Sequence, residues 1–153
     1  FLETNRYLRT GVLEGSPVIK ERIKYLDEIL SYSYFNEDVY VYRGLRLGSE
    51  QLQGGQTFKD LGFTSTSLSK GMAAHFAREE KGGVILKIKV KAGSPAFFTN
   101  RNEELEVLLP RGKTFKILKR VGEFEIPQPR HDVRAVPVIE VELLESVSIT
   151  KIL

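Results

Sequence analysis

The sequence contains no cysteine and only two histidines. Without cysteine the chain has neither disulfides nor thiol chemistry, and its redox compartment stays undetermined. His75 and His131 are too far apart in the sequence for the spacing of metal ligands, so we expect no metal site. Long apolar runs are also missing, because no stretch approaches the roughly eighteen residues of a membrane-spanning helix. We therefore expect a globular chain without a membrane partner.

Neither sign of charge is in large excess. The 153 residues include 23 basic and 20 acidic side chains, which gives a net charge of +3. This balance is too mild to argue for nucleic acid as a partner, although it does not exclude one. The length and the 41% hydrophobic content suit one globular domain. Because the chain begins with Phe1 rather than methionine, we expect residues 1–153 to be a single domain of a longer protein.

Residues 1–38 have the periodicity of helices. Ser16 and Pro17 predict a helix start, and apolar residues then recur at helical spacing as far as residue 32. A shorter helix is predicted over residues 6–13, ended by Gly15.

From Val39 onward the pattern becomes that of β-strands. Residues 39–44 are β-branched and aromatic, whereas residues 45–60 are polar and glycine-rich, which predicts a surface loop. One helix is predicted near residues 72–77, and further strands over residues 63–67, 84–90, 96–98, 106–109, 114–121 and 136–144. Helices followed by strands with short connections predict an α+β fold with a largely antiparallel β-rich core over residues 39–153.

Polar side chains gather at the ends of three predicted strands. They are Arg43 with Gly44, the hydroxyl run Ser65-Thr66-Ser67, and the pair Glu104 and Glu106. Taken singly, each group has a plain explanation as a solvated strand end or loop. If the strand predicted over residues 106–109 already begins near Leu105, its period of two places Glu104 and Glu106 on one face. Like charges repel, so that face is either well solvated or built for a cationic partner.

In this order and with these neighbours, the three groups resemble the motifs of the mono-ADP-ribosyltransferases. The similar segments are Tyr42-Arg43-Gly44, Phe63-Thr64-Ser65-Thr66-Ser67 and Glu104-Leu105-Glu106-Val107-Leu108-Leu109-Pro110. The likeness is to the branch with the bacterial binary actin-modifying toxins and the vertebrate arginine-specific ectoenzymes, and it covers about residues 39–145. It implies N-terminal helices packed on two mostly antiparallel sheets, with NAD as co-substrate and no metal.

The resemblance also implies roles for the site residues. Arg43 would bind the phosphate end of NAD, and Gly44 would let the backbone approach the carboxamide. Glu106 would stabilise the positive charge that builds on the ribose as nicotinamide leaves. Ser65 would hold Glu106 in place.

The remaining predicted site residues complete this picture. Thr66 and Ser67 belong to the same NAD-binding motif as Ser65, and Phe76, eleven residues after Ser65, would pack against the nicotinamide. Glu104 would orient an acceptor guanidinium and help to remove its proton. In the family, a glutamate at this position goes with arginine as the acceptor.

Two features depart from the family pattern. Several of the toxins carry an aromatic residue three positions before the first glutamate, where this chain has Arg101. An arginine there suggests a different, acidic target surface and weakens actin as a candidate substrate. The helical part before Arg43 is also shorter than the helical lobe of the toxins, so the chain is either a compact version or lacks an upstream part.

The interpretation that follows is transfer of ADP-ribose from NAD to an arginine of a target protein. NAD hydrolysis at the same site, and a non-catalytic binding module that keeps the fold, stay open as alternatives. By family analogy we expect action in the cytoplasm of a target or host cell, as part of a larger bacterial or phage effector that is secreted or injected. An immunity protein and a delivery domain are further candidate partners.

Overall fold

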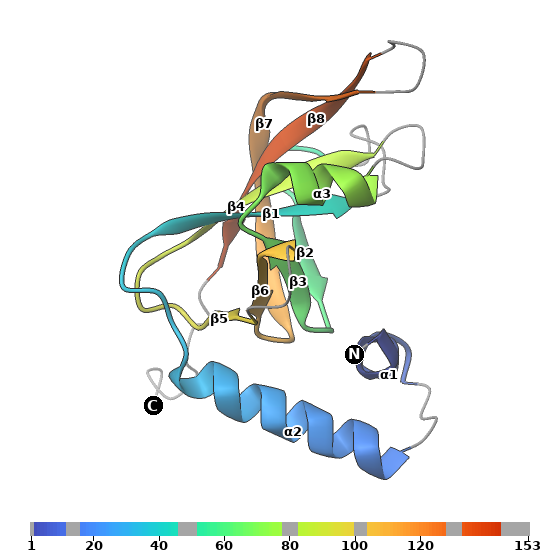
Figure 1. Ribbon diagram of the computed structural model, residues 1–153, viewed down its shortest axis with the longest axis vertical. Coiled ribbons are helices and arrows are strands. Elements are labelled where there is room, and N and C mark those ends of the chain that lie inside the picture. Colours follow the sequence, from blue (N-terminus) through green and yellow to red (C-terminus); the bar gives the residue numbers. More distant parts are fainter. Residues whose placement is uncertain are drawn as a thin grey trace.

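The computed structural model describes residues 2–11, 16–45, 52–77, 83–99, 104–127 and 133–144. Within these ranges the chain forms three helices and eight strands (Figure 1). The helices are α1 (Leu2–Thr10), α2 (Ser16–Tyr32) and α3 (Lys70–Ala77). The strands are β1 (Val39–Leu45), β2 (Thr57–Asp60), β3 (Thr64–Ser67), β4 (Val84–Val90), β5 (Phe97–Phe98), β6 (Glu106–Leu109), β7 (Lys113–Pro127) and β8 (Val133–Leu143). The predicted α+β class is confirmed.

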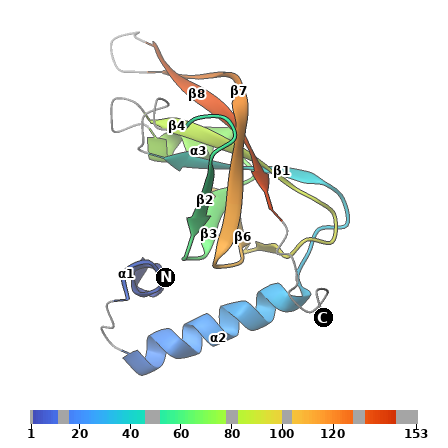
Figure 2. The ribbon, with the colours of Figure 1, turned by 180° about the vertical axis from the view of Figure 1, so that it is seen from behind.

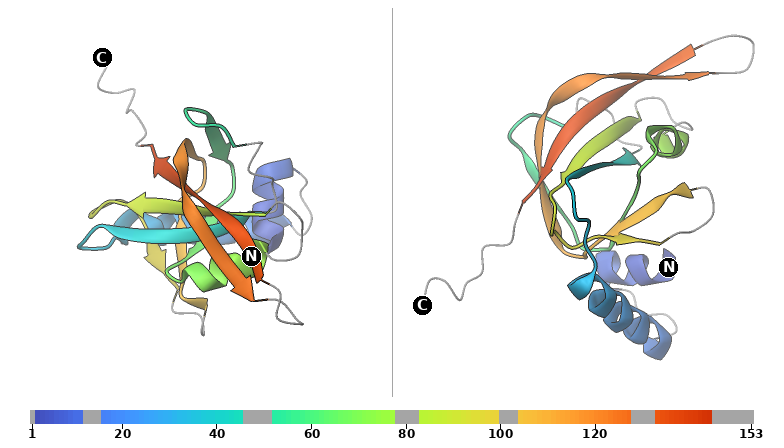
Figure 3. Two further views of the ribbon diagram at one scale, coloured as in Figure 1. Left: turned by 90° about the horizontal axis from the view of Figure 1, so that it is seen from above. Right: turned by 60° about the vertical axis from the view of Figure 1, so that its left-hand side comes forward.

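The described strands join one hydrogen-bonded sheet in the order β2-β7-β8-β4-β1-β3-β6-β5. Its pairs are antiparallel except for β4 with β8. β1 pairs with β4 over seven residues. With β3, by contrast, β1 shares a single residue pair in the described part of the chain, Tyr42 opposite Ser67. The mostly antiparallel prediction is confirmed, but the two separate sheets must be corrected to a single sheet that bends at this pair (Figure 3).

The alternation of side chains in β6 decides which face carries the candidate site. Val107 and Leu109 are fully buried in the main core, which they share with β1, β4, β7 and β8. Glu106 and Leu108 therefore point to the opposite face, since successive strand residues alternate. Leu108 packs there with Ile19 and Ile23 of α2. Figure 1 shows α1 and α2 on one side of β3, β5 and β6, with α3 on the other side beside β1.

The first helix lies earlier in the chain than predicted. α1 covers residues 2–10 rather than 6–13, and Gly11 follows it with a φ of +75°. The Gly11 N–H donates to the Tyr7 carbonyl at 2.7 Å, and glycine adopts this left-handed conformation at little cost. Gly15, the predicted end, is outside the described residues. The second helix agrees with its prediction to within one residue.

β2 lies in the segment that was predicted to be a loop, so that prediction is wrong for residues 57–60. Each residue of β2 pairs with the start of β7, over residues 113–116 (Figure 2). Phe58 also stacks on Phe115, with 5.2 Å between the ring centroids. A four-residue strand has too little local pattern to be recognised, and its partner in β7 stabilises it instead.

Candidate active site

Glu106 is the first residue of β6, and its carboxylate is held by hydroxyl groups from two directions. Ser65 on β3 donates from Oγ to Oε2 at 2.5 Å, and Thr99, just after β5, donates from Oγ1 to Oε1 at 3.2 Å. Glu106 is only 8% exposed. Because a buried carboxylate is costly without hydrogen bonds, these two donors explain how it is accommodated. The predicted contact between Ser65 and Glu106 is therefore present, whereas Thr99 was not singled out from the sequence.

The other hydroxyls of the Ser-Thr-Ser run bind backbone atoms. Thr66 Oγ1 donates to the Val107 carbonyl at 2.7 Å, and Ser67 Oγ donates to the Glu104 carbonyl at 2.7 Å. Both bonds fasten β3 to the chain around Glu106. In this structure their hydroxyls thus support the position of the two glutamates.

The approach to Glu106 is not a regular strand, which corrects the sequence argument for Glu104. Leu105 has a φ of +49° and is the one non-glycine residue with positive φ in the described part of the chain. β6 starts after it, so the period of two does not extend back to Glu104. Hydrogen bonds from Ser67 Oγ to the Glu104 carbonyl and from the Leu68 N–H to the Leu105 carbonyl stabilise this conformation. Glu104 itself is exposed, beside a buried Glu106.

Arg43 lies on β1 and forms an ion pair that the sequence did not reveal. Its Nη1 is 3.1 Å from Oδ2 of Asp60, at the end of β2. Asp60 also accepts hydrogen bonds from Arg9 of α1, the Thr64 hydroxyl and the Gly62 N–H. One carboxylate thus ties α1, β1 and β3 together. The available signal was weak: an aspartate two residues before a glycine is typical of a turn in which the side chain accepts the backbone N–H.

This cluster also sets the protonation of its members. Burial alone would raise the pKa of Asp60, but the hydrogen bonds from Arg9 and Gly62 and the charge of Arg43 outweigh it and hold the pKa below its ordinary value. Burial lowers the pKa of Arg43 from its ordinary value, and the Asp60 carboxylate offsets part of this effect. Both groups are charged at neutral pH.

Arg43 does not contact Glu106, but the sheet register brings their backbones close. Tyr42 lies opposite Ser67, and Ser67 lies opposite Glu106. Two strand spacings of about 4.8 Å place the Arg43 and Glu106 backbones roughly 10 Å apart. Arg43 shares the face of Val41, which packs in the main core with Val107. Glu106 alternates with Val107, so the side chains of Arg43 and Glu106 leave the sheet on opposite faces.

Gly44 and Phe76 are the remaining predicted NAD-binding residues. Gly44 lies in β1 opposite Ile85. Phe76 lies on α3, but its side chain, like Arg101, is outside what the structure describes.

A cavity of about 410 Å³ opens beside Glu106, between the helices α1 and α2 and the strands β5 and β6. Glu106 is the one predicted site residue among those that line it, which are Thr4, Arg22, Tyr25, Leu26, Phe97, Thr99, Glu106 and Leu108. Thr4 is fully buried, and its Oγ1 has no hydrogen-bond partner in the described chain. The cavity is lined by a fixed carboxylate, that of Glu106, and by Arg22, whose guanidinium could bind a polar ligand.

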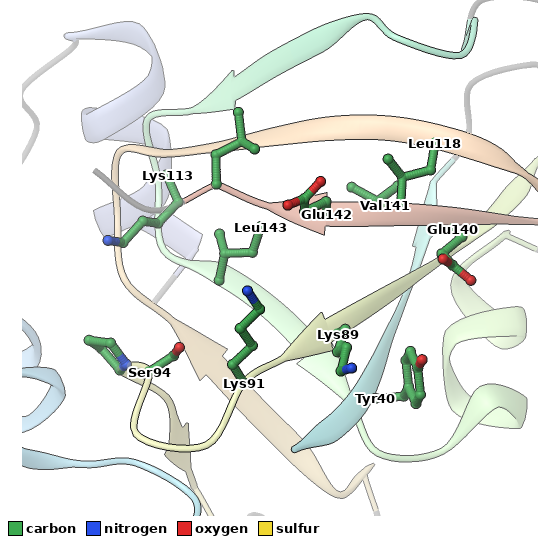
Figure 4. Close-up of a pocket in the computed structure, with 12 residues that line it drawn as sticks. Tyr40, Lys89, Lys91, Ser94, Lys113, Leu118, Glu140, Val141, Glu142 and Leu143 are labelled. Carbon is green, nitrogen blue, oxygen red and sulfur yellow. The ribbon is translucent and has the colours of Figure 1, made fainter. Parts of the chain in front are cut away.

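A second cavity of about 220 Å³ lies elsewhere and contains none of the predicted site residues (Figure 4). Lys89 of β4 and Glu142 of β8 both line it and are paired in the parallel register. The Lys89 ammonium forms an ion pair with Asp38 at 3.5 Å, so we give this part of the lining a structural role.

The described residues contain no group of three or more His, Asp or Glu side chains that could hold a metal ion. Among the described helices, none has both the length and the apolar character needed to span a membrane.

The chain was compared with models of protein families and with known proteins. The family model of the ADP-ribosyltransferase exoenzymes matches residues 2–136. No curated protein matches the chain by sequence.

Solved structures of three toxins are similar in fold. Plx2a from Paenibacillus larvae, an ADP-ribosyltransferase toxin, is 22% identical with a TM-score of 0.67, over 93% of this chain and 79% of that one. BECa of C. perfringens, an ADP-ribosylating toxin described with NADH, is 20% identical with a TM-score of 0.71, over 94% of this chain. The enzymatic component C2-I of the Clostridium botulinum C2-toxin is 20% identical with a TM-score of 0.72, over 95% of this chain. The chain spans only 40% of the length of BECa and of C2-I. With a family model matched over most of its length, the chain belongs to the ADP-ribosyltransferase exoenzyme family, and its fold is that of these toxins.

Proposed function

We propose that the chain transfers ADP-ribose from NAD to an arginine side chain of a target protein and releases nicotinamide. The observation that carries this proposal is the buried Glu106 carboxylate, which Ser65 and Thr99 fix at the wall of a cavity. Breaking the bond between ribose and nicotinamide builds positive charge on the sugar. A carboxylate that is already oriented stabilises that charge without reorganisation during the reaction.

In this proposal NAD uses Glu106 at the cavity together with Arg43 and Gly44 of β1, which do not line it. Glu106 offers an acceptor for a ribose hydroxyl. Arg43 provides a planar guanidinium for the pyrophosphate, and its ion pair with Asp60 restricts the orientation of that group before NAD arrives. Gly44 allows close backbone approach at the carboxamide. The match to BECa, which is described with NADH, supports a dinucleotide in this fold.

The remaining predicted site residues have supporting roles in the proposal. Thr66 and Ser67 bind the backbone on either side of Glu106. The role of Phe76, contact with the nicotinamide, rests on the family resemblance. Glu104 receives the acceptor: it is exposed where a protein substrate can reach it, and its backbone is fixed by Ser67. There it orients the arginine and accepts its proton.

The biological setting is proposed by analogy with the matched toxins. Residues 1–153 would act as one catalytic domain on a protein in the cytoplasm of a target cell, within a larger secreted or injected effector. A delivery domain and an immunity protein would be its other partners.

Two measurements test the activity. Nicotinamide release from NAD should fall by about 10²-fold or more in Glu106→Ala, since an oriented electrostatic group is lost. Glu125→Gln, an exposed position on β7, is the control and should match the wild type. A wild-type rate equal to that of Glu106→Ala would favour the binding module instead.

Arginine as the acceptor needs its own test. Glu104→Gln should abolish ADP-ribosylation of arginine but leave NAD hydrolysis largely intact. Mass spectrometry of a cell lysate incubated with the protein and NAD would identify the modified residue. Equal loss of both reactions, or adducts on residues other than arginine, would contradict the assigned role of Glu104. NAD turnover without any adduct would favour the hydrolase.

A further inference from the structure

Thr99 follows β5 and makes two hydrogen bonds to the same residue. Its backbone N–H donates to the Glu106 carbonyl at 3.1 Å, and its Oγ1 donates to Glu106 Oε1 at 3.2 Å. The backbone bond extends the pairing of β5 with β6, in which Phe98 lies opposite Val107. The side-chain bond adds nothing to that pairing and acts on the carboxylate alone.

We propose that Thr99 is a positioning residue for Glu106, a role that rests on the proposed transferase activity. The last torsion of a glutamate side chain has a broad energy minimum, so one hydrogen bond at one oxygen leaves the carboxylate free to rotate. β6 lies between β3 and β5. Ser65 on β3 donates to Oε2 of Glu106, and Thr99, directly after β5, donates to Oε1. Two donors on opposite sides fix the plane of the carboxylate.

The hydroxyls of Ser65 and Thr99 donate to different oxygens of the Glu106 carboxylate. Ser65 makes a short bond of 2.5 Å to Oε2, whereas the bond from Thr99 to Oε1 is 3.2 Å. A carboxylate oxygen has two lone pairs, so Oε1 can accept from Thr99 and from a ribose hydroxyl at the same time. Thr99 and Glu106 both line the cavity beside α2, where such a hydroxyl would arrive. Thr99 therefore sets the direction in which Glu106 meets the sugar.

The variant Thr99→Val tests this role, because valine keeps the shape and the backbone bond and removes only the hydroxyl. We expect kcat for nicotinamide release to fall by about 10- to 100-fold, the range that a displacement of up to 1 Å produces. The KM for NAD and its dissociation constant should change less than about twofold, because the substrate contacts of Arg43 persist. Thr99→Ser should recover most of the rate, since it restores the donor. Thr57→Val, at an exposed position of β2 away from the cavity, is the matched control and should equal the wild type.

The outcomes separate this inference from the activity on which it rests. If the wild type exceeds Glu106→Ala but Thr99→Val retains full kcat, the positioning role is wrong and the activity stands. If the wild type does not exceed Glu106→Ala, the proposed activity fails first. A loss in Thr99→Val that Thr99→Ser does not recover would assign Thr99 to packing and overturn the proposal. In the double variant with Ser65→Ala, shared action on one carboxylate predicts a loss smaller than the product of the single losses; a full product would contradict it.

Discussion

Replacing Asp60 by asparagine tests the cluster that joins α1, β1 and β3. The change keeps the size of the side chain, and the amide oxygen can still accept the Gly62 N–H. It removes the negative charge that faces Arg43 and Arg9. Arg43 would then be a largely buried cation without a counter-ion, which is a known cause of large destabilisation.

The magnitude follows from how exposed each partner is. Removing one partner of a fully buried ion pair costs about 3–5 kcal/mol. The Arg43 side chain is 24% exposed, so we take about 2 kcal/mol for its pair with Asp60. The Arg9 side chain is 39% exposed, and its pair adds at most about 1 kcal/mol after solvent screening. A total of about 3 kcal/mol corresponds to a decrease in Tm of roughly 6–12 °C for a domain of this size.

Thermal unfolding followed by circular dichroism measures this difference. Asp27→Asn is a matched control, because Asp27 also binds an arginine side chain through two nitrogens, Arg111 Nε and Nη2. Both of those side chains are exposed, at 39% and 45%, so we expect a loss of at most about 1 kcal/mol. If Asp60→Asn lowers Tm no more than Asp27→Asn does, burial of the Arg43 pair does not stabilise the fold as argued. The KM for NAD should rise in Asp60→Asn, because the guanidinium of Arg43 loses its fixed orientation.

Three further predictions concern pH and backbone conformation. The pKa of Asp60 is lower in the folded chain than the ordinary value of about 3.9, so the stabilisation by its carboxylate is present above about pH 4 and is lost as pH falls through the folded pKa. The difference in free energy of urea unfolding between the wild type and Asp60→Asn should therefore shrink from pH 6 to pH 3. A constant difference would refute this linkage. Leu105→Val should destabilise the fold by about 1–2 kcal/mol, because a β-branched residue tolerates positive φ poorly. Leu105→Gly should change the free energy of unfolding by less than about 1 kcal/mol, since glycine adopts positive φ readily. Equal losses in the two variants would argue against the left-handed conformation of residue 105. Gly11→Ala should cost about 1 kcal/mol in the same measurement, since Gly11 ends α1 with positive φ, and no loss would indicate a different helix end.

The helices and the long strands could be predicted because their patterns are local. α2 shows helical spacing over four turns with a Ser-Pro start, and β4 alternates in part between apolar residues and lysines. The boundary of α1 was misplaced because two glycines could end it, and the sequence does not say which one adopts positive φ. β2 escaped prediction since only its pairing with β7 makes it a strand.

The candidate site was predicted as a set of residue types in order, and the contact of Ser65 with Glu106 agrees with that prediction. The sequence could not reveal that Asp60 binds Arg43, because the two lie seventeen residues apart and an aspartate in a turn has many ordinary explanations. It could not reveal Thr99 for the same reason. Nor did it show that Leu105 interrupts the strand, so the relation of Glu104 to Glu106 depends on a turn rather than on strand alternation.

By itself, the sequence determined the family, the order of all the helices and strands except β2, and the chemical groups available for catalysis, because these depend on side-chain chemistry and on periodicity within single segments. Only the tertiary structure decided which hydroxyl faces which carboxylate oxygen, which carboxylate binds Arg43, and which face of β6 meets α2. Those contacts join segments that are distant in the sequence. Their geometry is set by strand register and by the bend between β1 and β3, and no local pattern encodes either.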